Sequence, residues 1–304
     1  MNREKSLVKY QKVIADLKNY YEDQSVNSIT HTIQETAWYD TIYRTFNEGI
    51  RLSWKAGKQD SLPASLIDYF HIAHLRYILL NIRKLFDKDK GTNSLPVLIQ
   101  QIDAYAMLFT RYNYVCYDRL PYTVSGYKTY DEERAYHQNN MRHNMFDLLS
   151  DVKNPNERRE DDKVDPDILK SLRKYCVLNS DVHTVIDKYI VHAERSFLGS
   201  AKAEALSSVT LLKLQRQYKV ALWAIQQIGK IIDSHIPTEV PVPQFDQLKG
   251  WDTSLFDKRI KKKLNKYWDK RMLFWDNWTK HYWTSNKYFI NPYKALLKQE
   301  RNNP

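Results

Sequence analysis

The stretch VTLLKLQRQYKVALWAIQQIGKII, residues 209–232, lies within the region 207–235, which carries the clearest helical pattern in the chain. Apolar side chains recur along it every three or four residues, which is the spacing that places them on one buried face of a helix. These positions are Val209, Leu212, Leu214, Tyr218, Ala221, Leu222, Ile225, Ile228, Ile231 and Ile232. The stretch therefore predicts a long helix packed inside a helical protein.

Similar patterns precede this segment. Residues 5–24 alternate apolar and charged side chains with a helical period, and a shorter helix is expected at about 131–150. The segment LIDYFHIAHLRYILLNIRKLFD, residues 66–87, is apolar on most faces, and it is therefore predicted to be central to the core. Residues that can cap or begin further helices are Ser28, Ser94, Asp165 and Ser180.

The composition of the 304 residues agrees with an all-α protein. Only 7 glycines and 10 prolines occur, which is too few for the turns of a β-sandwich or barrel or for a glycine-rich phosphate loop. Cys116 and Cys176 are the two cysteines, so no disulfide framework, metal site or cofactor is expected. No apolar run reaches the roughly 18 residues of a membrane span, and the first residues lack an apolar signal core, so a cytoplasmic protein is expected.

The chain divides by composition into three segments. Residues 1–236 are predicted to form an up-and-down helical bundle, with a polar, irregular insertion at 118–165. Residues 237–250 are proline-rich and are predicted to form an extended linker. Residues 251–304 are predicted to form a basic, aromatic helical extension.

The extension holds most of the net charge of +11, because it has 13 lysines and arginines against 5 acidic residues. It also holds five of the eight tryptophans, at 251, 268, 275, 278 and 283. Cations interleaved with aromatic rings suit a phosphate backbone with unstacked bases. Alternatively, Leu264, Trp268, Trp275, Trp278 and Tyr282 form one helical stripe packed on the bundle. In either case the cations are expected to attract RNA, and the candidates are Lys261, Lys262, Lys263, Lys266 and Arg271.

The segment IDKYIVHAER, residues 186–195, is the strongest chemical signal. On a helix, Lys188, His192 and Arg195 share one polar stripe. Metal-independent cleavage of RNA needs a group that takes the proton from the 2′-hydroxyl, and cations that hold the phosphate as charge builds. A histidine between a lysine and an arginine supplies both.

Other histidines are weaker candidates. His71 and His74 lie three residues apart on the predicted helix 66–87, without the glutamate of a metalloprotease motif, which favours a structural role. His137 and His143 accompany Arg134 and Arg142 in the insertion. They would make an acid–base cluster if that region folds over a site, and otherwise they lie on a solvated helix.

Three segments, in order, resemble the HEPN superfamily, and in particular the AbiU-type abortive-infection family. IDKYIVHAER is similar to the signature Arg-Asp-Lys-x-Ile-Ala-His-x-Asp. LLNIRKLFDKDKGTNSLPVLI resembles the family's second core helix, which ends in Arg-Leu-Phe-Asp, and residues 209–232 resemble its last helix. The resemblance covers roughly residues 30–235.

The resemblance implies a helical bundle, often a homodimer, in which the histidine helices face each other across a cleft. It implies a metal-independent ribonuclease in bacterial antiphage defence, sometimes with an antitoxin or another defence protein as partner. Alternatively, it implies an inactive relative that only binds RNA or a partner. His192 matches the catalytic histidine, and Asp187 and Lys188 match the polar residues before it. Arg83 and Asp87 match the core-helix signature and are candidates for RNA contact.

The chain departs from the signature at one important position. Ile186 stands where the family has its arginine, and an aliphatic side chain cannot make a bidentate phosphate contact. Arg195, Lys188 or Arg83 would have to replace that arginine in a nuclease. Simpler roles remain open: His192 as a hydrogen-bonded bundle residue, Asp87 as a helix stop, and Arg83–Asp87 as an intrahelical ion pair.

Overall fold

The computed structural model describes residues 2–22, 28–57, 62–124, 126, 128–187, 211–232, 248–249, 256 and 258–280, and the fold is all-α, as predicted. No β-strand occurs in these residues, which contain one isolated bridge, between Thr110 and Lys163. The longer helices are α1 (Arg3–Glu22), α2 (Ile29–Lys55), α3 (Ala64–Phe86), α4 (Leu95–Ala104), α6 (Tyr130–Ser150), α7 (Pro166–Tyr175), α10 (Leu211–Ile232) and α12 (Lys258–Lys280). The shorter ones are η1 (Ala106–Leu108), α5 (Arg111–Val115), η2 (Pro155–Glu157) and α8 (Ser180–Val185).

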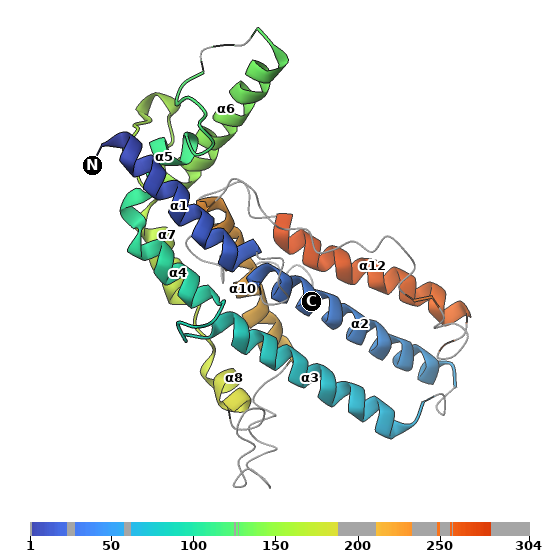
Figure 1. The fold of residues 1–304 in the computed structure, drawn as a ribbon. Coiled ribbons are helices and arrows are strands. Elements are labelled where there is room, and N and C mark those ends of the chain that lie inside the picture. The colour runs from blue at the N-terminus through green and yellow to red at the C-terminus, as the bar shows by residue number, and fades with distance from the viewer. Residues whose placement is uncertain are drawn as a thin grey trace.

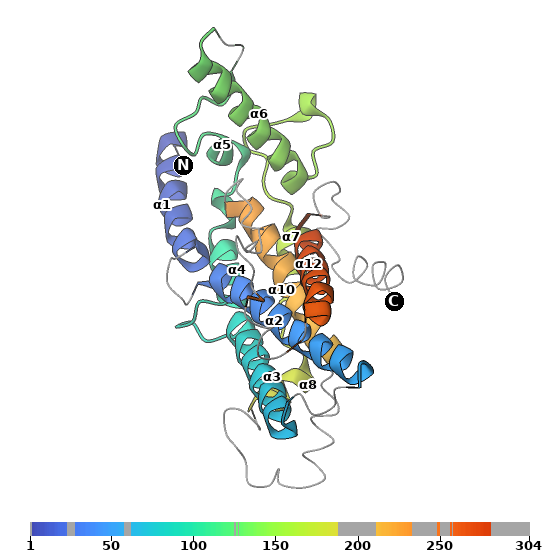
Figure 2. The same ribbon diagram turned by 90° about the vertical axis from the view of Figure 1, so that its right-hand side faces the viewer.

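The molecule is elongated, and its helices form distinct groups along its length (Figure 1). α5 and α6 lie at one end, and α8 lies toward the other (Figures 1 and 2). α2, α3 and α12 run side by side and extend away from the crossing of α1, α4 and α10. The two segments that carry candidate chemistry, around α6 and around α8, are therefore well separated.

α10 is the central helix, because it contacts α1, α2, α3, α4, α6 and α12. Every residue from 217 to 232 is buried, including Gln226, Gln227 and Lys230. The predicted helix is confirmed, but it is enclosed on all sides in its second half and not only along one apolar stripe. Leu212, at the start, is an exception to the predicted burial, since 48% of its surface is exposed. Val209 lies outside the described residues.

α12 packs along α2, so the described part of the basic extension belongs to the helical body. Leu264, Trp268 and Trp275 are buried, and Trp268 meets Trp38 of α2 edge to face at 5.4 Å. Just before α12, the ring of Phe256 lies against Gly49 of α2. A Cβ at that glycine would lie 2.4 Å from Phe256 Cζ, so α2 needs a residue without a side chain there.

The prediction that 66–87 is central to the core is wrong for its first half. Ile78, Ile82 and Leu85 of α3 are buried, but Tyr69 and Ile72 are 65% and 53% exposed. Helical periodicity and composition show which residues of a helix are apolar. They do not show over what length of that helix the neighbouring helices pack against it.

The 118–165 region contains more order than its sequence indicated. α6 begins with a capping box in which the side chain of Thr129 accepts from the Glu132 N–H and the Glu132 carboxylate accepts from the Thr129 N–H. The helix expected at 131–150 is thus confirmed. The chain after it returns to α5, where the Arg111 N–H donates to the carbonyl oxygen of Asp162.

Within the described residues, no helix combines the length and the apolar character that crossing a membrane requires. The predicted linker 237–250 lies outside the described residues, apart from Leu248 and Lys249.

Candidate functional site

The signature-like segment begins where α8 ends, and its first two residues are described. Ile186 is fully buried in the core, whereas the side chain of Asp187 is 30% exposed. Lys188, His192 and Arg195 lie outside the described residues, so their predicted roles stay predictions. The burial of Ile186 explains why this position cannot contact a phosphate, whatever its neighbours do.

Arg83 and Asp187 form an ion pair between two of the three segments on which the resemblance rests. Nη1 of Arg83, in the last turn of α3, lies 2.9 Å from Oδ1 of Asp187, and the two residues are 104 positions apart. The Arg83 side chain is 36% exposed. A charged pair at a half-open surface keeps part of the guanidinium edge available to a further anion, because arginine has five N–H donors.

His183 completes a cluster that the sequence-based prediction missed. Its Nδ1 lies 3.1 Å from Oδ2 of Asp187, one helical turn further along, and its side chain is 60% exposed. The carboxylate of Asp187 therefore lies between an imidazole and a guanidinium. A carboxylate that orients an imidazole is a common arrangement around general acid–base histidines. The spacing His-x-x-x-Asp was a visible signal, since residues four apart share a helix face.

Asp87, the other position matched by the resemblance, does not pair with Arg83. It ends α3 with extended backbone angles (φ −63°, ψ 142°), and its Oδ1 accepts a hydrogen bond from the Asp89 N–H at 3.0 Å. Its carbonyl oxygen accepts from the Ser94 hydroxyl at 2.6 Å. Asp87 thus shapes the loop between α3 and α4, which is the helix-stop alternative.

The cations of α12 divide between its two faces. Lys262, Lys263 and Lys266 are exposed, and Lys261 is half-buried. Arg271 turns inward, where its Nη2 lies 2.8 Å from Asp40 Oδ2. Only 14% of the Arg271 side chain is exposed, so this internal ion pair leaves little of its guanidinium for the predicted contact with RNA.

The buried tryptophans of α12 support packing over base stacking. Trp268 and Trp275 belong to the core, so the described aromatic residues of the stripe are structural. Trp251, Tyr282 and Trp283 lie outside the described residues, as does the side chain of Trp278.

The histidines of the insertion are separated by the fold of α6. His143 is buried, with Nε2 2.9 Å from the carbonyl oxygen of Tyr122, and burial lowers its pKa. His137 is exposed and lines a pocket with Arg134 and Arg142. His137 thus lies on an exposed face of α6, as in the solvated-helix alternative, and His143 lies inside, so the two histidines do not form one acid–base cluster.

No group of three or more metal-ligating side chains occurs in the part of the chain that the structure describes. Comparison of the sequence with protein families and with curated proteins, and of the fold with solved structures, found no match.

Proposed function

We propose that the chain is a metal-independent ribonuclease of the HEPN type that acts in bacterial antiphage defence. The observation that carries this proposal is the ion pair between Arg83 and Asp187, at 2.9 Å. It brings the end of α3 to the start of the segment 186–195, and these are two of the stretches on which the resemblance rests.

The proposed chemistry needs no cofactor. His192 removes the proton from a ribose 2′-hydroxyl, and the 2′-oxygen then attacks the adjacent phosphorus. The bond from phosphorus to the 5′-oxygen breaks, a proton passes to that oxygen, and a 2′,3′-cyclic phosphate remains. Lys188, Arg195 and Arg83 hold the phosphate as its negative charge increases. Asp187 positions Arg83, and His183 is a second imidazole close to the same phosphate.

We expect the purified chain to cleave RNA in the presence of EDTA, and His192→Ala to cleave at least about a hundredfold more slowly, since a general acid or base contributes 10²–10⁴-fold. Arg83→Met should reduce cleavage about tenfold through loss of one charged phosphate contact. Product length and the cyclic phosphate terminus are measured on a labelled RNA. His71→Ala is the matched control, because His71 is an exposed histidine on α3.

The same variants test the biological role. Cells that express the chain should restrict phage growth, and His192→Ala should restore plaque formation. Intact RNA under all conditions, together with full restriction by the variant, would contradict the proposal.

A second candidate function is RNA binding without cleavage, and two observations favour it. Ile186 occupies the arginine position of the signature and is buried. α12 also exposes a basic face, because its exposed cations lie within about 140° of one another at 100° per residue, opposite its buried side chains. These cations are Lys258, Arg259, Lys262, Lys263, Lys266 and Lys270.

For this face we expect a steep salt dependence of RNA affinity. Replacing Lys262, Lys263 and Lys266 together by glutamine should reduce the slope of log affinity against log salt by about 2, because each phosphate contact to a single strand contributes about 0.7. Fluorescence anisotropy with a labelled RNA measures the slope. The control replaces three exposed lysines elsewhere, Lys5, Lys9 and Lys153, and should leave the slope nearly unchanged.

A further inference from the structure

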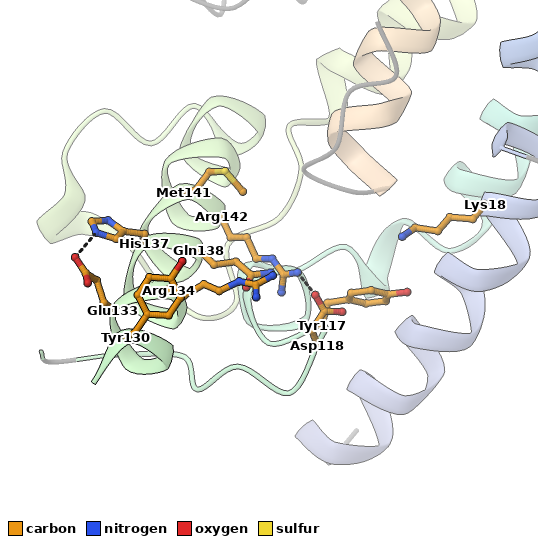
Figure 3. Close-up of a pocket in the computed structure, with 10 residues that line it drawn as sticks. All are labelled: Lys18, Tyr117, Asp118, Tyr130, Glu133, Arg134, His137, Gln138, Met141 and Arg142. Atoms are coloured by element: carbon orange, nitrogen blue, oxygen red, sulfur yellow. Dashed lines mark hydrogen bonds and ion pairs between the residues drawn. The ribbon is translucent and has the colours of Figure 1, made fainter. Parts of the chain in front are cut away.

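A pocket of about 670 Å³ is lined by residues of α1, of α6 and of the segment that follows α5. Figure 3 shows Lys18 reaching toward it from α1, while most of the other lining side chains extend from α6. The residues that line it are Lys18, Tyr117, Asp118, Tyr130, Glu133, Arg134, His137, Gln138, Met141 and Arg142. A pocket of this volume is in the range of small-molecule sites.

The charges of the pocket do not cancel. Arg142 is paired with Asp118, and Glu133 Oε1 lies 3.7 Å from Nε2 of His137. Arg134 is exposed and forms no ion pair with any residue that the structure describes. The lining has three cationic side chains, Lys18, Arg134 and Arg142, against two acidic ones, Asp118 and Glu133. An anionic ligand would therefore find the Arg134 guanidinium, which gives up no ion-pair partner among the described residues on binding.

The side of the pocket that Arg142 forms is held in a fixed position. The Arg142 side chain is 5% exposed, and its Nη1 donates to the carbonyl oxygen of Val115 at 3.1 Å. The guanidinium is fixed by backbone as well as by a carboxylate, so it forms a preorganised part of the pocket. Arg142 connects α6 to the segment after α5 that carries Tyr117 and Asp118.

Flat and apolar surfaces complete the pocket. The Lys18 ammonium lies 5.4 Å from the centre of the Tyr117 ring. Tyr130, in the first turn of α6, is 79% exposed, and Met141 is 46% exposed. Aromatic rings of this kind stack on nucleobases, and the free energy gained depends little on which base is stacked. Inorganic phosphate alone would use the cations and leave these surfaces uncovered.

We propose that this pocket binds a nucleoside monophosphate, with the phosphate at Arg134, the base against Tyr117 or Tyr130, and Lys18 as a second cation of the lining. The ligand is a free nucleotide or the phosphorylated end of a nucleic acid, which share this chemistry. The site is independent of the proposed ribonuclease, because none of its lining residues belongs to α3, α8 or the segment 186–195.

Isothermal titration calorimetry on the full chain tests the proposal. AMP, GMP, CMP and UMP are titrated alongside adenosine and inorganic phosphate. We expect the nucleotides to bind, and to bind at least about tenfold more tightly than adenosine or inorganic phosphate alone. DNA oligonucleotides with and without a 5′-phosphate distinguish the two sources, since they carry the terminal phosphate but no 2′-hydroxyl to be cleaved.

Two variants assign the binding to this pocket. Arg134→Ala and Lys18→Ala should each weaken nucleotide affinity about tenfold, whereas Arg76→Ala and Lys9→Ala, exposed cations on α3 and α1, should not. His192→Ala should bind nucleotide normally, so failure of the ribonuclease proposal would not affect this result. Absence of nucleotide binding at millimolar concentration, binding unaltered by both pocket variants, or equal affinity for inorganic phosphate would each overturn the proposal.

Discussion

Replacement of Arg111 by methionine is expected to lower the free energy of unfolding by about 3–5 kcal/mol, because it removes one partner of a buried charged network. Arg111 is fully buried. Its Nε lies 2.8 Å from Asp162 Oδ2, and its Nη1 lies 2.7 Å from Asp147 Oδ1. Methionine keeps the approximate volume of the side chain but leaves both carboxylates, which are only about 15% exposed, without their shared cation.

Removing Arg111 should also loosen the structure locally, besides lowering the free energy of unfolding. Arg111 also donates to the Ser150 hydroxyl at 3.1 Å and to the carbonyl oxygen of His143 at 3.2 Å. One guanidinium thus connects α5, the second half of α6 and the segment that follows η2. In its absence these three elements lose their common contact, and the region that holds the α1–α6 pocket should loosen first.

Urea denaturation followed by circular dichroism gives the change in unfolding free energy. Arg173→Met is the control, because Arg173 forms an exposed ion pair with Asp103, and such pairs contribute at most about 1 kcal/mol. Equal losses of unfolding free energy in the two variants would show that the Arg111 network stabilises the protein no more than an exposed ion pair does.

Local signals in the sequence identified the helices well. Ser28 caps α2 by accepting from the His31 N–H at 3.0 Å, and Asp165 caps α7 by accepting from the Asp167 N–H, as predicted. The cap expected at Ser180 is displaced by one residue, since Asn179 accepts from the Asp181 N–H and α8 starts at Ser180. Such signals involve residues two or three positions apart, so a single sequence is enough to read them.

Contacts between distant residues could not be read in the same way. The 118–165 region looked irregular because its order depends on Arg111, whose partners lie 36 and 51 positions away. The candidate site shows the same limit. Arg83 and Asp187 were both candidates, but nothing in either segment indicated that they pair, and the nearest acidic residue on the helix, Asp87, was the simpler expectation.

Asp40→Asn is expected to destabilise the protein by about 3 kcal/mol, because it leaves two guanidinium groups without their carboxylate. Asp40 is buried on α2. Arg44 donates from Nε to both of its oxygens at 2.9 Å, and Arg271 of α12 approaches at 2.8 Å. His74 of α3 lies 3.7 Å away. This one carboxylate therefore connects the three helices that run side by side, and its loss should weaken the attachment of α12.

The same residue predicts a pH dependence. Burial raises the pKa of Asp40, but His74 and the charges of Arg44 and Arg271 outweigh it and lower the pKa from 3.8 to about 2. Because the folded form holds its proton less tightly than the unfolded form, the carboxylate contributes about 2 kcal/mol above the unfolded pKa. That contribution is lost as the pH falls from about 4 to about 2.

Urea titrations of the wild type and Asp40→Asn at a pH near 5 and a pH near 2.5 separate this contribution from those of other carboxylates. The difference in unfolding free energy between the two proteins should shrink by most of about 2 kcal/mol at the lower pH. Glu48→Gln, on the same helix, is the control, because its ion pair with the exposed Arg51 is worth at most about 1 kcal/mol. A difference that stays constant with pH would show that Asp40 keeps its ordinary pKa in the folded protein.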